Sequence, residues 1–379
     1  MKKINDIIAC KALFFIMAFS IGLWTIRIPT IRDQIQTDYL GIGYIMATFA
    51  IGSIIMMLCA NYFISKSSSK KIIIYIVIAQ WLLWLPVPFI KDLVTFMILA
   101  FMFGFCFGLF EICINLKASK IESREGKSMM SGFHAFWSIG LLSGSLLTSL
   151  FLEYKISFFT NSLIFIIMIS PILYFSSLTI KNIQSDTLSF LSIFFKWPLF
   201  LIILFLLAIT AVFLEGGTDS WGSLYMRDYI LAEGFNIGLA AIAFNGSMVL
   251  GRLIGDRLKE IFGIYNFLVF SVIGSFVGSI FIASSSSLLF AIIGFVIAGF
   301  CVSSIIPICY TFGASIKNLN PTVGITIITI GTYGVFMIAP PTLGYVADIF
   351  GIEYVYTPML ILFLLISIIV IFQKKLFKN

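Results

Sequence analysis

Residues 198–221 read PLFLIILFLLAITAVFLEGGTDSW, and no charged side chain occurs in this stretch before Glu215. A membrane span requires about 20 predominantly apolar residues, so the stretch predicts a transmembrane segment. Because lipid offers no water to satisfy backbone N–H and C=O groups, the segment must be helical. The apolar residues run continuously instead of alternating with polar ones, which argues against a membrane β-barrel.

Stretches of the same kind recur along all 379 residues, of which 60% are hydrophobic and only 11% charged. A soluble protein of this composition could not cover its surface with polar groups. We therefore expect an all-α membrane protein with twelve transmembrane helices. The predicted spans are 5–26, 41–64, 72–90, 93–116, 129–152, 156–179, 198–221, 237–254, 264–283, 287–311, 322–345 and 353–373.

The longest polar interruption falls at the midpoint, with six predicted spans on either side. It predicts an N-terminal six-helix half at 1–180, a cytoplasmic linker at 181–197 and a C-terminal six-helix half at 198–379. Short internal matches support a repeat, since both the second and the eighth span carry Ile-Gly followed by Gly-Ser. Parallel repeats of this type occur in membrane transporters.

The net charge of +7 reports topology and not a nucleic-acid partner. With the N-terminus inside, 19 of the 24 Lys and Arg residues fall on the inner side. This bias places both termini in the cytoplasm, and we expect a multi-pass protein of a bacterial-type inner membrane. The basic start leads into an uncleaved first helix. A single histidine excludes a multi-His metal site, all six cysteines lie within predicted spans, and no cofactor is expected.

The segment Gly251-Arg252-Leu253-Ile254-Gly255-Asp256-Arg257-Leu258 resembles the G-x-L-x-D-R loop signature of the major facilitator superfamily, with one extra residue before Asp256. The resemblance implies two six-helix halves that alternate access to a central site. It also implies a conformational gate on the cytoplasmic face, formed here by Gly251, Arg252, Gly255, Asp256 and Arg257. The first half has lost the signature, because Asn61-Tyr62-Phe63 stand in its place.

Three further stretches resemble the fucose permease branch of that superfamily and a poorly characterised bacterial group near it. They are Glu111-Ile112-Cys113-Ile114-Asn115, the segment 133–140 with the sequence FHAFWSIG, and the segment 215–221 with the sequence EGGTDSW. The resemblance implies a proton-coupling carboxylate at Glu111.

Ionisable groups inside a span cost about 2.5–3.5 kcal/mol at its centre and usually mark function. Glu111 lies about 27 Å along its span at ~1.5 Å per residue, in the predicted inner half. Proton coupling there competes with a structural salt bridge. His134, near the inner start of the fifth span, is a candidate for proton relay or solute binding, with a structural histidine as the alternative.

Glu215 and Asp219 are four residues apart and share one helix face. With Gly216 and Gly217 beside them, the helix is expected to break there and offer free backbone groups to a solute. The alternative is a periplasmic cap paired with Arg227 or Arg27. Arg27 itself is a candidate for binding an anionic solute, for pairing with those carboxylates, or for anchoring the membrane interface.

Polar and aromatic side chains at depth suit a small polar solute such as a sugar, although tyrosine and tryptophan are also ordinary interfacial anchors. The predicted substrate-binding residues are Arg27, Asn115, Trp137, Glu215, Asp219, Trp221, Asn245 and Tyr333.

These observations predict a secondary active transporter and not an enzyme, since no polar catalytic cluster occurs at either interface. We expect a monomer that takes up a small polar solute with protons as the coupling ion. Pro340-Pro341 should bend the eleventh span for a rocking motion. Export of toxic or metabolic compounds is the alternative function. Many drug antiporters of the superfamily that this chain resembles carry a proline at the position after Gly144, and its absence here favours uptake.

Overall fold

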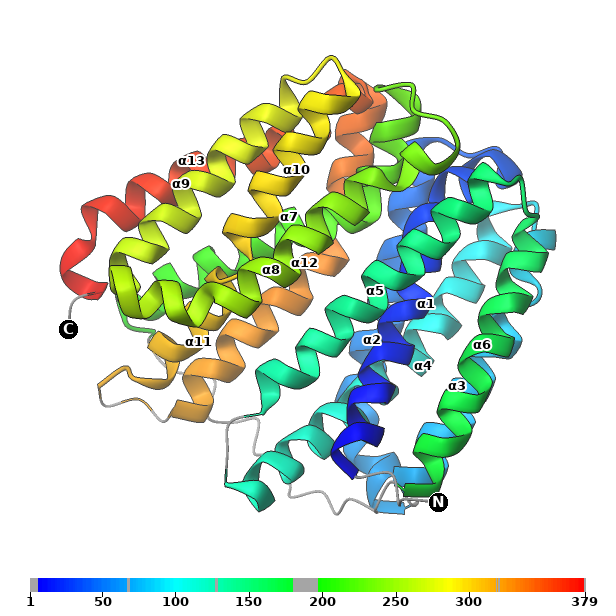
Figure 1. Ribbon diagram of the computed structural model, residues 1–379, viewed down its shortest axis with the longest axis horizontal. Coiled ribbons are helices and arrows are strands. Elements are labelled where there is room, and N and C mark those ends of the chain that lie inside the picture. Colours follow the sequence, from blue (N-terminus) through cyan, green and yellow to red (C-terminus); the bar gives the residue numbers. More distant parts are fainter. Residues whose placement is uncertain are drawn as a thin grey trace. The chain divides into compact units, whose positions relative to one another are not determined.

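The structure is a computed structural model that describes residues 6–66, 69–126, 129–179, 197–317, 319 and 321–377. Over these residues the chain forms helices and no strand, and twelve segments are long and apolar enough to cross a membrane (Figure 1). The predicted all-α fold with twelve spans is confirmed.

The chain divides into two compact units, one formed by residues 1–187 and 233–238 and the other by 188–232 and 239–379. The predicted linker at 181–197 lies outside the described residues except for Trp197, so its conformation stays a prediction. In the first unit, α1 packs chiefly on α5, and α2 packs on α4. Its helices are α1 (Asp6–Ile35), α2 (Tyr39–Lys66), α3 (Ser69–Trp84), η1 (Val87–Phe89), α4 (Leu93–Glu125), α5 (Met130–Glu153), α6 (Phe158–Thr179) and η3 (Gly234–Gly238).

The second unit repeats this pairing, since α7 packs on α12, the eleventh span, and α8 packs on α10. Its helices are α7 (Leu199–Asp228), α8 (Leu239–Phe262), α9 (Ile264–Ala283), α10 (Leu288–Val302), α11 (Ile305–Ala314), α12 (Pro321–Phe350), η4 (Ile352–Tyr354), α13 (Thr357–Phe372) and η5 (Lys374–Phe377).

Glycines set the closest approaches within both units, and they do so at equivalent places. A Cβ on Gly104 of α4 would overlap the carbonyl oxygen of Phe49 on α2. A Cβ on Gly299 of α10 would overlap the carbonyl oxygen of Phe244 on α8. Both residues of the second pair come 195 positions after their counterparts (104 to 299, 49 to 244). The tertiary contacts therefore carry the internal repeat more clearly than the short sequence matches do.

The prediction of a broken seventh span is wrong, because α7 is continuous through Gly216 and Gly217 to Asp228. The two glycines serve packing instead. A Cβ on Gly216 would lie 2.7 Å from the ring of Phe336 on α12, and one on Gly217 would overlap the methyl group of Met359 on α13. The closeness of Phe336 and Met359 therefore requires glycine at these two positions. The backbone of α7 remains helical through them.

The tenth span, by contrast, is interrupted where one continuous helix was expected. It consists of α10 and α11, separated by a turn at Ser303–Ser304. Pro307 explains the position of the turn, because proline has no N–H to give the carbonyl group four residues earlier, at Ser303, and its ring clashes with that carbonyl. The Pro340-Pro341 pair does not interrupt α12, which is helical from Pro321 to Phe350.

The short helix η3 lies in the sequence between α7 and α8 but belongs to the first unit. The backbone N–H of Phe235 donates to the Glu153 carboxylate at the end of α5, with N and Oε2 2.9 Å apart. Gly238 contacts the Ser149 side chain on the same helix, where a Cβ would overlap the hydroxyl group. The Glu153 carboxylate and the close approach of Gly238 to Ser149 therefore hold this segment against α5.

Candidate functional site

The second unit gathers polar side chains between α7 and α8. Glu215 accepts a hydrogen bond from Arg252, with Oε1 and Nη2 3.4 Å apart, and each side chain is 25% exposed. One turn further along α7, Asp219 accepts from the buried amide of Asn245, with Oδ1 and Nδ2 2.9 Å apart. The two contacts are consistent with antiparallel helices, since the partners on α8 run in the opposite order. Three of the predicted substrate-binding residues, Glu215, Asp219 and Asn245, thus lie together.

This cluster sits near the middle of both helices. Glu215 is within two residues of the midpoint of α7, and Arg252 is within two residues of the midpoint of α8, which is ~2 Å in each case. Asp219 and Asn245 each lie about 8 Å from the midpoint of their helix, toward the predicted outer ends. The ionisable groups are therefore placed at the depth where a charge is most costly in a membrane, unless it is paired or faces water.

Arg252 was predicted to act in a cytoplasmic gate, and the structure gives it a partner on α7 that the motif did not indicate. The flanking glycines pack on the interrupted tenth span. A Cβ on Gly251 would lie 2.7 Å from the Phe300 carbonyl oxygen, and one on Gly255 would lie 2.6 Å from the Ser304 hydroxyl oxygen. Arg257 is exposed, and the side chain of Asp256 lies outside the described part of the chain. A gate formed by these five residues stays a prediction.

In the first unit, the corresponding stripe of candidate side chains lies along α4. Phe107, Glu111 and Asn115 follow one another at intervals of four residues, and the Asn115 amide donates to the Glu111 carbonyl oxygen at 2.9 Å. Glu111 is partly buried and lies about two residues, or ~3 Å, from the middle of α4. It lies on the side of that midpoint toward Glu125, so its predicted place in the inner half of the span stays a prediction, although α4 continues beyond the predicted end of the span at residue 116.

Two predicted residues of α5 lie near this stripe. The ring of Trp137 contacts that of Phe107 edge-on, with centroids 6.1 Å apart. One turn further inward on each helix come Glu111 and His134, so the antiparallel register puts these two at a similar depth. His134 is exposed and contacts the Phe14 ring on α1 at 5.2 Å.

Arg27 is buried, with 4% of its surface exposed, and it joins α1 to the start of α6. Its Nε donates to the Asn161 side chain at 2.9 Å, and its Nη2 donates to the Ile156 carbonyl oxygen at 2.8 Å. The Phe158 ring covers the guanidinium at 5.4 Å. These contacts hold α1 against the start of α6 within the first unit, and all three predicted roles of Arg27 stay predictions.

The two remaining aromatic candidates belong to the second unit. Trp221 is fully buried and lines a narrow crevice between α7 and α12, together with Gly217, Phe336 and Pro340. Tyr333 of α12 is partly buried. The crevice wall is apolar, so it does not extend the hydrogen-bonding surface offered by Asp219 and Asn245.

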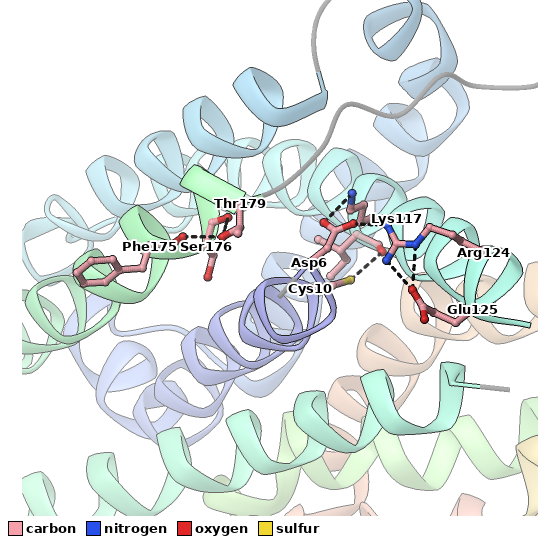
Figure 2. A network of polar contacts seen from close by, with 9 residues as sticks. Asp6, Cys10, Lys117, Arg124, Glu125, Phe175, Ser176 and Thr179 are labelled. Atoms are coloured by element: carbon pink, nitrogen blue, oxygen red, sulfur yellow. Dashed lines mark hydrogen bonds and ion pairs between the residues drawn. The ribbon is translucent and has the colours of Figure 1, made fainter. Parts of the chain in front are cut away.

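A polar network at the inner end of the first unit was not predicted (Figure 2). Asp6, at the start of α1, contacts Lys117 at 2.9 Å and Arg124 at 3.0 Å, both on α4, and Arg124 also contacts Glu125. The side chains of Asp6 and Lys117 are 8% and 5% exposed. Lys117 and Arg124 are seven residues apart and so share a face of α4, but their common partner Asp6 is more than 100 residues earlier in the chain.

Comparisons with known proteins agree with this architecture. The family model of the Major Facilitator Superfamily matches residues 12–317. An uncharacterised MFS-type transporter of Yersinia pestis is 23% identical over 369 residues, which are 96% of this chain and 94% of that protein. The membrane protein MosC of Rhizobium meliloti is 23% identical over 361 residues, which are 89% and 83% of the two chains.

Two solved structures share the fold at low identity. The nucleoside transporter NupG superposes with a TM-score of 0.76 at 13% identity, covering 99% of this chain and 100% of its own. A bacterial homologue of the human lysosomal transporter Spinster, in an inward-facing and unoccupied conformation, gives 0.73 at 12% identity, covering 98% and 97%. The resemblance to the fucose permease branch stays a prediction. Because the family model covers well over half of the sequence, this chain belongs to the major facilitator superfamily and is a membrane transporter.

Proposed function

We propose that this protein takes up a small polar solute by alternating access and that protons drive the uptake. The observation that carries the proposal is the group of hydrogen-bonding and charged side chains near the middle of α7 and α8, namely Glu215, Asp219, Asn245 and Arg252. Transporters of this kind bind their solute near the bilayer midplane. Side chains that are a quarter exposed at this depth can exchange a partner within the protein for a solute.

Glu111 is the proposed coupling carboxylate. It lies close to the middle of α4, and one turn inward of the Phe107–Trp137 contact it shares its depth with His134. A carboxylate at that depth is stabilised by a proton or by a partner, so a change in protonation can follow a change in surroundings as the solute binds.

The distribution of basic residues supports insertion in a bacterial-type inner membrane with both termini in the cytoplasm. We propose a monomer, which size-exclusion chromatography with light scattering tests directly.

Purified protein in proteoliposomes with an inward proton gradient tests the function. The solute panel comprises nucleosides, sugars, amino acids and organic acids, with nucleosides first because NupG is a nucleoside transporter. We expect gradient-driven accumulation of one class, and Arg252→Gln should reduce it at least tenfold. Glu233→Gln, on an exposed position outside the helices, is the matched control and should leave uptake unchanged. Accumulation of the solute that requires a proton gradient of the opposite, outward direction would favour the exporter.

The coupling role of Glu111 is tested separately with Glu111→Gln. Solute counterflow, which needs no proton gradient, should persist in this variant, whereas gradient-driven accumulation should be lost. Intact gradient-driven uptake in Glu111→Gln would show that the coupling group lies elsewhere.

A further inference from the structure

The cluster on α7 and α8 contains two carboxylates but one guanidinium, and the guanidinium contacts only one of the two. Arg252 lies 3.4 Å from Glu215. Among the described residues, the recorded hydrogen-bond donor to Asp219 is the neutral amide of Asn245. If both carboxylates were ionised, the Glu215–Arg252 pair would be neutral overall and Asp219 would retain one negative charge.

Within the second unit, the described α-helices that follow α8 supply no positive charge. The sequences of α9, α10, α11 and α13 contain no Asp, Glu, Lys or Arg at all, and α12 contains only Asp348, near its end. Asp256, one turn beyond Arg252, has its side chain outside the described part, and any charge it adds is negative. Two further cations on α8, Arg257 and Lys259, lie five and seven residues beyond Arg252, on the side away from Asn245. The other titratable groups on described elements packed against α7 are Glu260 on α8, Cys301 on α10, Cys309 and Tyr310 on α11, Tyr333 and Tyr345 on α12, and Glu353 and Tyr354 on η4, together with Tyr356 just before α13.

The environment of Asp219 differs from that of Asp6, which serves as an internal comparison. Asp6 contacts two cations, Lys117 and Arg124. The single amide donor of Asn245 suits either form of Asp219, since a protonated carboxyl group still accepts a hydrogen bond on its carbonyl oxygen. A carboxylate inside a membrane span that contacts no cation costs several kcal/mol, and one proton removes that cost.

We propose that Asp219 is a reversible proton-binding site of the C-terminal unit, held in place by Asn245. One proton adds to a carboxylate oxygen of Asp219, and the charge of that side chain changes from −1 to 0. The site is additional to Glu111 in the N-terminal unit. Its part in transport rests on the function proposed above, but the binding of the proton does not.

Infrared spectroscopy tests this without a solute, because the carbonyl stretch of a protonated carboxyl group is separate from the carboxylate bands. Purified full-length protein in lipid is titrated with acid and base. We expect a carboxyl band in the wild type that titrates with pH and is absent from Asp219→Asn. The matched control is Asp228→Asn on the same helix, whose aspartate already contacts Arg227, and it should keep the band. Glu111→Gln should also keep it.

A second variant guards against loss of folding in Asp219→Asn. Asn245→Leu keeps the carboxyl group and removes its hydrogen-bond donor, so the same band should shift to higher frequency. An unchanged band in either Asp219→Asn or Asn245→Leu overturns the proposal. Failure of the transport function would appear differently, as an absence of solute uptake in the wild type with the band still present.

Discussion

The network of Asp6, Lys117 and Arg124 makes a quantitative prediction about stability. Asp6→Asn removes the counter-charge that Asp6 gives to Lys117, whose side chain is only 5% exposed. Breaking a buried ion pair from one side costs about 3–5 kcal/mol. Because the partly exposed Arg124 shares Asp6, we take the lower end, about 3 kcal/mol. Replacing both charges, as in Asp6→Asn with Lys117→Met, leaves no enclosed charge and should cost about 1 kcal/mol.

Thermal unfolding in detergent, followed by tryptophan fluorescence, measures these differences. At about 2–4 °C per kcal/mol, Asp6→Asn should lower the melting temperature by about 6–12 °C. The double variant should recover more than half of that loss. Glu125→Gln, which changes an exposed partner of Arg124, is the control and should have little effect. Strictly additive losses in the double variant would refute the reasoning, because they would mean that Asp6 and Lys117 do not interact energetically.

Three further outcomes are expected. Gly104→Ala should lose about 1–3 kcal/mol of stability by overlap with the α2 backbone, whereas Gly334→Ala, with nothing within 4 Å, should not; equal melting temperatures would contradict this. Glu153→Gln replaces a charge-assisted acceptor, so amide exchange at Phe235 should accelerate roughly fivefold, for about 1 kcal/mol; an unchanged rate would exclude the contact. The Thr95 N–H holds the pKa of Asp92 below its usual value, so this cap stabilises α4 above about pH 4 and is lost as the pH falls through the folded pKa. Corrected amide exchange at Thr95 should therefore rise at low pH in the wild type but not in Asp92→Asn.

Some local features follow from single residues and their chemistry. Pro307 sets the turn at Ser303–Ser304 because its missing N–H and its ring act on a carbonyl four positions away, and this rule applies to any helix. The pair Gly216-Gly217 shows the opposite case. The sequence does not show that Phe336 and Met359 lie against these glycines. Whether two adjacent glycines break a helix or allow close packing can therefore be decided only once the neighbouring helices are known.

The site was predictable in its members but not in its pairing. Glu215 and Asp219 stand out as carboxylates in an apolar span, and Asn245 as a polar residue in another. Arg252 belongs to a motif that was predicted at the inner end of its span but lies near the middle of α8, and nothing in that motif points to Glu215, 37 residues earlier. Their contact depends on how far α8 is shifted along α7, whereas the glycines of the motif, Gly251 and Gly255, pack α8 on the tenth span.

The amino-acid sequence by itself determined that this chain crosses a membrane twelve times as helices, because apolar runs of that length have no other way to satisfy their backbone in lipid. Only the tertiary structure decided which charges meet. Ion pairs such as Asp6–Lys117 and Glu215–Arg252 join residues far apart in the chain, and the register between packed helices is a property of the whole set of contacts between them.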